Sequence, residues 1–416
     1  MARLVLDYCK HFPTGIDDPN HCCDAKIVLI GEAPGRNEDE RGVPFVGAAG
    51  FMLDGWLEKA GLNRRDLWIT NVVRRRPPNN EIYAIGREAL ERGIEELHQR
   101  LAKLADPYVI IPTGDIALNA LLGPNHTGRL RITDWRGSVL QYSDRSGRSV
   151  KVIPTIHPAA TFRQPILTKF CIADWLRIAG DSQFKELRLP ERELIIDPNN
   201  GQVERFIAAV VHLCDGTQGC ICPVCENALK DGCGPVMAID VENSMKDGGY
   251  FDKLTCAGFS YDPRFAMTIS TRRKDYGSED TYNYALNAVK ALCESPIAKV
   301  LQNGLTDAIK LHVYGINVHN YAYDLMEMDH ALDPNDGGDT EKGSEDAPKD
   351  KTFKLEMRSL KILTSLFTRE PYYKAEGKLG PDFDWVKHMK YNGKDACTTR
   401  EICGVLRQRL RNRGLL

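Results

Sequence analysis

Two carboxylates one residue apart are the first feature of this chain that could do chemistry. Asp240 and Glu242 alternate within VMAIDVE, a short apolar run that predicts a β-strand. Side chains at alternate positions of a strand project from the same face, so the two carboxylates can act together at one site. Acidic alternation is more often a solvated strand face, and this spacing alone is a weak indication of function.

A second group of candidate ligands is rich in cysteine. Residues 213–234 lack apolar periodicity and contain Cys214, Cys220, Cys222, Cys225 and Cys233. The stretch CICPVC includes a C-x2-C pair, and together with Cys214 or Cys233 it can supply four thiolates for a tetrahedral zinc ion. We take Cys214, Cys220, Cys222 and Cys225 as the ligands of a structural Zn²⁺. The alternative is a reduced, exposed loop, but a segment this poor in apolar residues needs another source of order.

Five further motifs follow one another between Gly31 and Arg163. They are GEAPGRNEDERGVPFVGAAGFML (31–53), ITNVVRRRPPNN (69–80), TGDIALNALLG (113–123), WRGSV (135–139) and PTIHPAATFR (154–163). In this order they resemble the uracil-DNA glycosylase superfamily, most closely its bacterial and archaeal branch that usually carries an iron-sulfur cluster. Such an enzyme extrudes a base, holds it against an aromatic ring and reads its Watson–Crick edge. The resemblance implies a three-layer α/β/α domain.

The resemblance also implies roles for individual residues. Phe45 would stack on uracil, and the amide of Asn71 would pair with the uracil edge in a way that cytosine cannot match. His157 would stabilise the negative charge on the departing base. Glu32 would position water or stabilise an oxocarbenium-like sugar, and Arg163 would contact the substrate. Taken singly, such residues are usually core, cap or turn residues; their order and spacing favour the functional interpretation.

The cysteines depart from this family's pattern, which has two near the N-terminus, one just after the Asn strand and one about a helix later. Arg75 stands at the third position, and the N-terminal candidates are Cys9, Cys22 and Cys23. We therefore expect no iron-sulfur cluster. A related branch that bonds covalently to DNA carries a histidine in a loop after the Asn strand, and RRRPPNN has none. The lost cysteines motivate an alternative in which this half is a non-catalytic DNA-recognition module.

Two motifs downstream end in aspartates that could join the carboxylate pair at one site. After AIDVE come NGLTD (303–307) and YNGKD (391–395). The three resemble, in order, the motifs of the DnaQ-like 3′–5′ exonucleases of family A polymerase type, which have a ribonuclease H-like fold. The match extends from roughly Pro190 to the C-terminus.

This second resemblance implies the ligand set of an exonuclease. Asp240, Glu242, Asp307 and Asp395 would hold two divalent ions, which activate the attacking water and stabilise the departing 3′ oxygen. Hard oxygen ligands favour Mg²⁺ or Mn²⁺. Tyr391, four residues before the last aspartate, would orient the water and indicates the tyrosine subclass.

Alternating strands and helices must position these residues. In the first half we predict strands in AKIVLIG, LWITNVV, YVIIPTG and KVIPTIHP, and helices in FMLDGWLEKAGL, Ala89 to Leu104 and IALNALLG. This order predicts an α/β domain with a parallel sheet covered on both faces, whose functional loops lie at the carboxyl ends of the strands.

The chain divides into two domains by this pattern. Residues 1–188 form the glycosylase-like domain, and residues 189–416 form the exonuclease domain, which includes the Cys-rich insertion 213–234 and a polar loop, 333–350, that we expect to be mobile. In the second domain VMAIDVE, LTCAGFSYD and FAMTISTRR predict strands. VERFIAAVVHL and TYNYALNAVKALCE predict helices, and YAYDLMEMDHALDP predicts a helix-rich stretch.

Composition limits the classes of protein. The 416 residues carry a net charge of −2, which argues against nucleic-acid binding through overall charge but leaves room for a local basic run such as Arg74 to Arg76. No apolar run approaches the roughly 20 residues of a membrane span, and no secretion signal is evident. We expect a cytoplasmic protein that does not contact membranes, in a host cytoplasm if the source is a phage. Its thirteen cysteines suggest thiols or metal ligands.

The leading hypothesis is a bifunctional DNA repair or replication enzyme that excises uracil and degrades DNA from the 3′ end. Its substrates would be single-stranded DNA or 3′ ends, some containing uracil. No polymerase region follows within these residues, so we expect a separate DNA polymerase as partner, as in a phage-like replication system. In the alternative, only the exonuclease is active. A third hypothesis, a degenerate exonuclease half, is disfavoured by its five matched residues.

Overall fold

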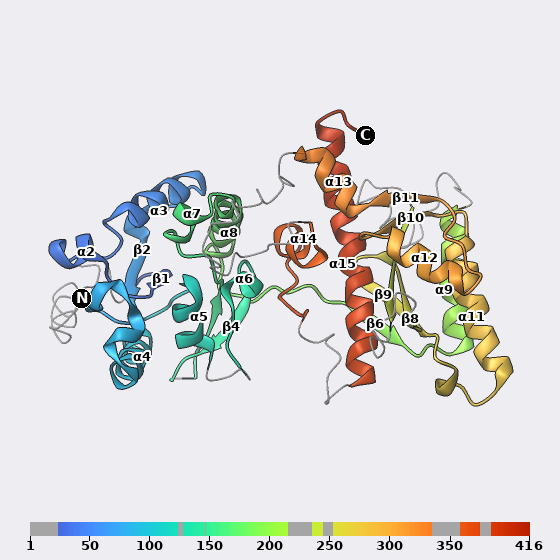
Figure 1. Cartoon of the computed structure of the whole chain (residues 1–416), viewed down its shortest axis with the longest axis horizontal. Coiled ribbons are helices and arrows are strands. Elements are labelled where there is room, and N and C mark those ends of the chain that lie inside the picture. Colours follow the sequence, from blue (N-terminus) through green and yellow to red (C-terminus); the bar gives the residue numbers. More distant parts are fainter. Residues whose placement is uncertain are drawn as a thin grey trace, which may run out of the picture. The chain divides into compact units, whose positions relative to one another are not determined.

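The structure is a computed structural model that describes residues 24–123, 128–145, 147–214, 235–243, 253–334, 358–374 and 384–416. By their internal contacts the residues separate into two compact units. The first unit comprises Met1–Leu189 and Arg369–Tyr372, and the second comprises Pro190–Thr368 and Tyr373–Leu416. Figure 1 labels their elements.

The first unit is built on a five-stranded sheet of order β2-β1-β3-β5-β4. Pairing is parallel throughout except for β4, which runs antiparallel to β5. The strands are β1 (Ile27–Gly31), β2 (Leu67–Asn71), β3 (Val109–Pro112), β4 (Leu140–Ser143) and β5 (Ser149–Val152). Every residue of β1, β2 and β3 is buried, as expected of parallel strands covered on both faces.

Helices connect these strands and form the outer layers of an α/β/α unit. They are α2 (Arg36–Arg41), α3 (Ala48–Lys59), α4 (Arg87–Leu101), α5 (Gly114–Leu122), α6 (Ile132–Trp135), α7 (Ala160–Arg163) and α8 (Leu167–Asp181). Helix α3 packs against α8, and α4 packs against α5. The three-layer fold class expected from the motifs is confirmed. Strand β4 and helix α8 were not anticipated from the sequence.

The second unit contains a six-stranded sheet of order β11-β10-β7-β8-β9-β6. Strands β7, β8 and β9 form an antiparallel meander, whereas β10 pairs parallel with β7 and β11, and β6 pairs parallel with β9. The strands are β6 (Glu193–Ile196), β7 (Val236–Asn243), β8 (Leu254–Asp262), β9 (Phe265–Ser270), β10 (Ala298–Leu301) and β11 (Tyr321–Asp324). The ribonuclease H-like α/β class is thereby confirmed. The stretch YAYDLMEMDHALDP, expected to be rich in helix, begins with the strand β11 and continues as the helix at Leu325–Leu332.

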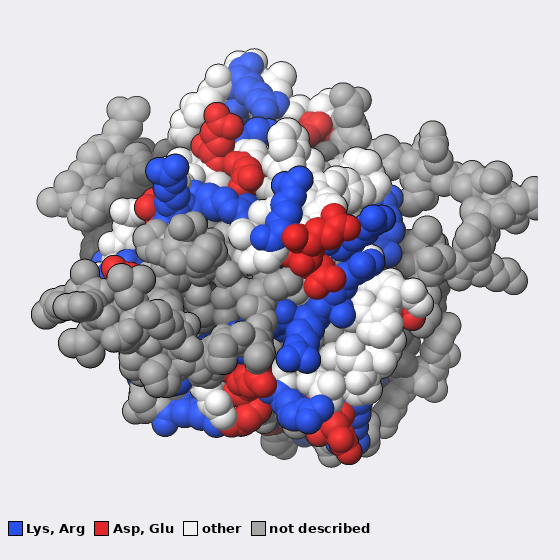
Figure 2. Space-filling view, turned by 90° about the vertical axis from the view of Figure 1, so that its left-hand side faces the viewer, with Lys and Arg blue, Asp and Glu red and all other residues white. Residues whose placement is uncertain are grey.

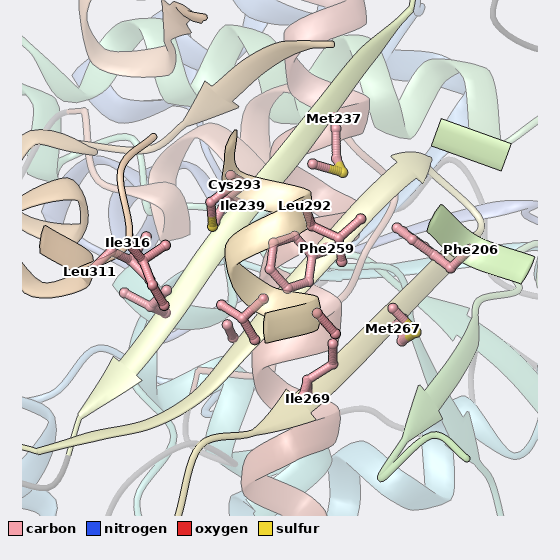
Figure 3. Close-up of a cluster of buried hydrophobic side chains, with 14 of the residues drawn as sticks. Phe206, Met237, Ile239, Phe259, Met267, Ile269, Leu292, Cys293, Leu311 and Ile316 are labelled. Carbon is pink, nitrogen blue, oxygen red and sulfur yellow. The ribbon is translucent and has the colours of Figure 1, made fainter. Parts of the chain in front are cut away.

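Two groups of helices cover the opposite faces of this sheet. They are α9 (Asn200–Cys214), α11 (Glu279–Glu294) and α12 (Leu305–Val313) on one face, and α13 (Leu325–Leu332), α14 (Leu360–Phe367) and α15 (Trp385–Asn412) on the other. Figure 3 shows the core of the first face, where side chains from β7, β8 and β9 meet those of the helices. This core includes Phe206, Met237, Ile239, Phe259, Met267, Ile269, Leu292 and Cys293.

The alternation of side chains along β7 decides which face of the sheet its two carboxylates occupy. Met237, Ile239 and Val241 lie in the core beneath α9 and α11, whereas Val236 and Ala238 lie in the core beneath α15. Since the side-chain period of a strand is two, the next even positions, 240 and 242, continue on the face covered by α15. Among the described residues, no helix is long and apolar enough to span a membrane.

Candidate functional site

A close-packed group of side chains lies at the carboxyl ends of β1 and β2 in the first unit. Gly31 ends β1 and is paired in register with Asn71, which ends β2. A Cβ atom on Gly31 would lie 2.3 Å from Asn71 Oδ1 and 2.8 Å from a ring carbon of Phe45. A glycine is therefore required here, because any side chain would displace the amide or the ring.

Phe45 reaches this position through a strained backbone. It has a φ of 53°, in the left-handed region that a bulky residue rarely adopts, and its side chain is buried. A Cβ on Gly50 would lie 1.7 Å from the carbonyl oxygen of Phe45, so the start of α3 passes tightly against this loop. Glu38 Oε1 accepts hydrogen bonds from the amides of Val46 (3.1 Å) and Gly47 (2.9 Å). The surrounding structure holds the strain in place, as at many functional sites.

His157 lies beside this aromatic ring, with 5.5 Å between the two ring centroids. Burial lowers the pKa of His157 to about 4, an effect that Glu38 partly opposes. The imidazole is therefore neutral near pH 7. Its Nδ1 accepts a hydrogen bond from the amide of Ala159 (3.2 Å), which leaves the proton on Nε2. A neutral imidazole that donates from a fixed nitrogen can stabilise a negative charge that develops on a bound group.

The other predicted residues of this unit differ in their surroundings. Glu32 follows Gly31 directly and is half-buried; burial, and then the charge of Asp115, raises its pKa. Arg163 is exposed at the end of α7. The sequence did not reveal Arg100, whose buried guanidinium donates to the hydroxyl of Thr70 and to the carbonyl oxygen of Asn71 (3.0 Å). Arg100 thus fixes the end of β2.

The arginine run does not form one solvated basic patch. Arg74 is buried and pairs with Glu96 at 3.5 Å, Arg75 is exposed, and Arg76 donates to Asn80 Oδ1 at 2.8 Å. Figure 2, which views one face of the molecule, shows Lys and Arg interspersed with Asp and Glu. Among the described residues on that face, opposite charges are neighbours.

The second unit brings three carboxylates together on the α15 face of its sheet. One ligand oxygen from each of Asp240, Glu242 and Asp395 lies within 4.8 Å of the others. Tyr391 and Asp395 are four residues apart on α15, so both face the sheet side of the helix. Asn392 donates to Asp240 Oδ2 at 2.7 Å, and Gly258 of β8 leaves room for its amide.

The carboxylates in this cluster disfavour one another's charge. Burial, and then repulsion from Asp395, raises the pKa of Asp240 well above its ordinary value. The same two causes raise the pKa of Glu242 to about 8. Such a group is stable in ionised form when a cation neutralises it. Its oxygen donors fit a hard divalent ion, so a candidate acidic metal site exists in the second unit.

Asp307, the fourth predicted ligand, lies outside this group of three, but its charge interacts with that of Asp395. Burial raises its pKa to about 6, the ion pair with Lys310 (3.1 Å) opposes the shift, and Asp395 adds to it. The start of α12, which carries Asp307, is held by Asp324, whose Oδ2 accepts from the amide of Gly304 at 2.8 Å.

Two residues of this site were not assigned from the sequence. The Tyr373 hydroxyl donates to Asp395 Oδ1 at 2.5 Å. Lys374 forms an ion pair with the other oxygen of Asp395 and donates from Nζ to the Tyr391 hydroxyl at 3.0 Å. Both lie in the sequence YYK (372–374), and nothing in its spacing indicated a contact with a residue more than twenty positions away.

The predicted zinc ligands lie mostly outside the described residues. Cys214 is the last residue of α9, while Cys220, Cys222 and Cys225 fall in a part of the chain that the structure does not describe. The same holds for the N-terminal Cys9, Cys22 and Cys23, and for the loop 335–350.

Comparison with known proteins identifies a family for part of the first half and a relative that matches a longer part of the chain. Residues 19–176 match the family model of the uracil DNA glycosylase superfamily. The Type-4 uracil-DNA glycosylase of Archaeoglobus fulgidus is 38% identical over 157 residues, which are 37% of this chain and 75% of that protein. A DNA polymerase of Bacillus phage SP01 is 27% identical over 317 residues, which are 74% of this chain and 31% of the polymerase.

Solved structures resemble the chain more distantly. RNase D of Escherichia coli, an exoribonuclease involved in structured RNA processing, aligns with 54% of this chain and 47% of its own. The TM-score is 0.34 and the sequence identity is 14%.

Proposed function

The chain belongs, through residues 19–176, to the uracil-DNA glycosylase superfamily, and on this premise we propose that it carries two hydrolytic activities on DNA. Its first unit would excise uracil by hydrolysis of the N-glycosidic bond. Its second unit would release nucleotides from the 3′ end by metal-dependent phosphodiester hydrolysis.

The close approach of Gly31, Asn71 and Phe45 carries the first part of the proposal. An extruded uracil would stack on the Phe45 ring and pair with the Asn71 amide, whose strand end is fixed by Arg100. As the glycosidic bond breaks, negative charge grows on the base, and His157 would donate from Nε2 to a uracil oxygen. The half-buried Glu32 would hold the attacking water or stabilise the sugar cation. Arg163, exposed on α7, would contact the DNA backbone.

The gathering of Asp240, Glu242 and Asp395 carries the second part. Together with Asp307 they would hold Mg²⁺ or Mn²⁺, in a two-ion arrangement that supplies an activated water and neutralises the leaving oxygen. The hydroxyl of Tyr391, held by Lys374, would orient the water for attack on the terminal phosphodiester. Asn392 would keep Asp240 in its ligand orientation.

The phage relative, a DNA polymerase, supports a place for this chain in DNA replication or repair beside a polymerase. We also propose that Cys214, Cys220, Cys222 and Cys225 hold a structural zinc. Measurement of bound zinc in the purified chain and in Cys222→Ser tests that assignment, and an equal zinc content in the two would overturn it.

One experiment tests both activities. A 5′-labelled single-stranded DNA with one uracil is incubated with the full chain, first in EDTA and then in Mg²⁺. An abasic site in EDTA and a 3′ ladder in Mg²⁺ are expected. Intact DNA in EDTA would favour the non-catalytic recognition module for the first unit, and a missing ladder would reject the exonuclease assignment.

A further inference from the structure

Lys374 forms a direct ion pair with the group of Asp240, Glu242 and Asp395 in the second unit. Its side chain is 18% exposed, and its ammonium pairs with Asp395, whose side chain is 5% exposed. The same Nζ atom donates to the hydroxyl of Tyr391 and lies 4.7 Å from the centre of that ring. One lysine thus contacts both functional residues that α15 contributes.

The two oxygens of Asp395 are held by different kinds of group. Oδ1 accepts from the neutral hydroxyl of Tyr373, whereas Oδ2 faces the ammonium of Lys374. Asp395 is also a member of the group of three whose oxygens could bind one ion. The charge of Lys374 is felt beyond its direct contact, because it opposes the rise in pKa of both Asp240 and Glu242.

We propose that Lys374 is a positioning residue of the exonuclease site that also competes with the divalent ion: its ammonium occupies Asp395 until the ion binds, and it holds the Tyr391 hydroxyl in place. The inference deepens, and rests on, the proposed exonuclease function. Ion binding exchanges the ammonium for the metal at Oδ2, while the hydrogen bond from Lys374 to Tyr391 can persist. No covalent bond is made or broken in this exchange.

Replacement of Lys374 by methionine should strengthen Mn²⁺ binding and slow turnover. Lys374→Met leaves an unbranched side chain that is one atom shorter and removes the charge. A divalent ion then meets neither a competitor nor a like charge, and the dissociation constant for Mn²⁺ should fall roughly tenfold. The turnover number at saturating Mn²⁺ should also fall, because the Tyr391 hydroxyl loses its partner. If Lys374 only stabilised the fold, its replacement by methionine would not tighten Mn²⁺ binding.

The chain offers matched controls. Tyr373→Phe removes the hydrogen bond to the other oxygen of Asp395 without changing any charge, and it should not tighten Mn²⁺ binding. Lys387 is exposed near the start of α15, and Lys387→Met removes a positive charge at a distance from the cluster. It should leave both Mn²⁺ affinity and turnover unchanged.

The experiment is a titration of the EDTA-stripped full chain with Mn²⁺, in which free Mn²⁺ is followed by electron paramagnetic resonance. Each variant is compared with the parent chain, and nucleotide release is measured at saturating Mn²⁺. Tighter binding with slower turnover in Lys374→Met, and partial recovery of turnover in Lys374→Arg, are expected. Equal or weaker Mn²⁺ binding by a Lys374→Met protein that melts like the parent would overturn the inference. So would equal tightening in Tyr373→Phe.

Failure of the underlying function would look different. If the parent chain neither binds Mn²⁺ nor releases nucleotides, the exonuclease assignment is rejected, and this inference with it. If the parent chain does both and Lys374→Met does not bind Mn²⁺ more tightly, the exonuclease assignment stands and only the role of Lys374 is rejected.

Discussion

The two candidate sites of this chain are built by opposite physical means. The candidate site of the first unit packs a ring and an amide against a glycine and adds a neutral histidine. The site of the second unit gathers carboxylates that repel one another. A site complete in its own side chains should work without added ions, whereas a cluster of like charges is completed by a cation. Substitutions and metal removal should therefore separate the two activities.

The largest separation should come from the acidic cluster. Asp395→Ala should reduce nucleotide release on the order of 10⁴-fold, because it removes a proposed ligand and the partner of Lys374 together. Removal of divalent ions with EDTA should have the same effect. Uracil release should be unchanged in both cases, and a parallel loss of both activities would contradict the division of labour.

The reciprocal substitution is His157→Ala. It removes the proposed donor to the departing base, and uracil release should fall on the order of 10²- to 10³-fold. Single-turnover measurement of abasic-site formation gives the rate of the chemical step. Nucleotide release in Mg²⁺ serves as the internal control, and a variant with normal uracil release would remove His157 from the mechanism.

Gly31→Ala tests the packing of the candidate site in the first unit. The added methyl would meet Asn71 Oδ1 and the Phe45 ring, so uracil release should fall roughly 10- to 100-fold. Gly55→Ala is the matched control, since a Cβ at Gly55 in α3 meets nothing within 4 Å. Equal activity of the two variants would show that this site tolerates displacement of the ring and amide.

The smallest effect concerns stability against acid. In the unfolded chain His157 takes up a proton near its ordinary pKa of about 6.5, but in the folded chain only near 4. The unfolded state therefore binds more protons between these values, and stability falls as the pH drops through this window. His157→Gln should lose this contribution, so between pH 6.5 and 4 its melting temperature should fall by several degrees less than that of the parent chain. If the melting temperatures of the two proteins had the same pH dependence, the lowered pKa of His157 would be contradicted.

The sequence anticipated the fold class, and three of the carboxylates that it singled out, Asp240, Glu242 and Asp395, lie together in the structure. Apolar runs of β1, β2 and β3 are long enough and uniform enough to identify buried parallel strands. The spacing of Asp240 and Glu242 fixed their common face, and the spacing of Tyr391 and Asp395 fixed theirs. Short elements such as β4 were missed because their apolar pattern is too brief to differ from a loop.

The sequence by itself determined the local periodicities. The side-chain period is two residues in a strand and 3.6 residues in a helix, and both values depend on the backbone alone. Contacts between distant segments were decided by the tertiary structure. Lys374 meets Asp395, Arg100 meets Asn71, and Gly31 faces Phe45 because packing brings separate elements together. Such contacts depend on which elements become neighbours, and a linear pattern does not encode their distances.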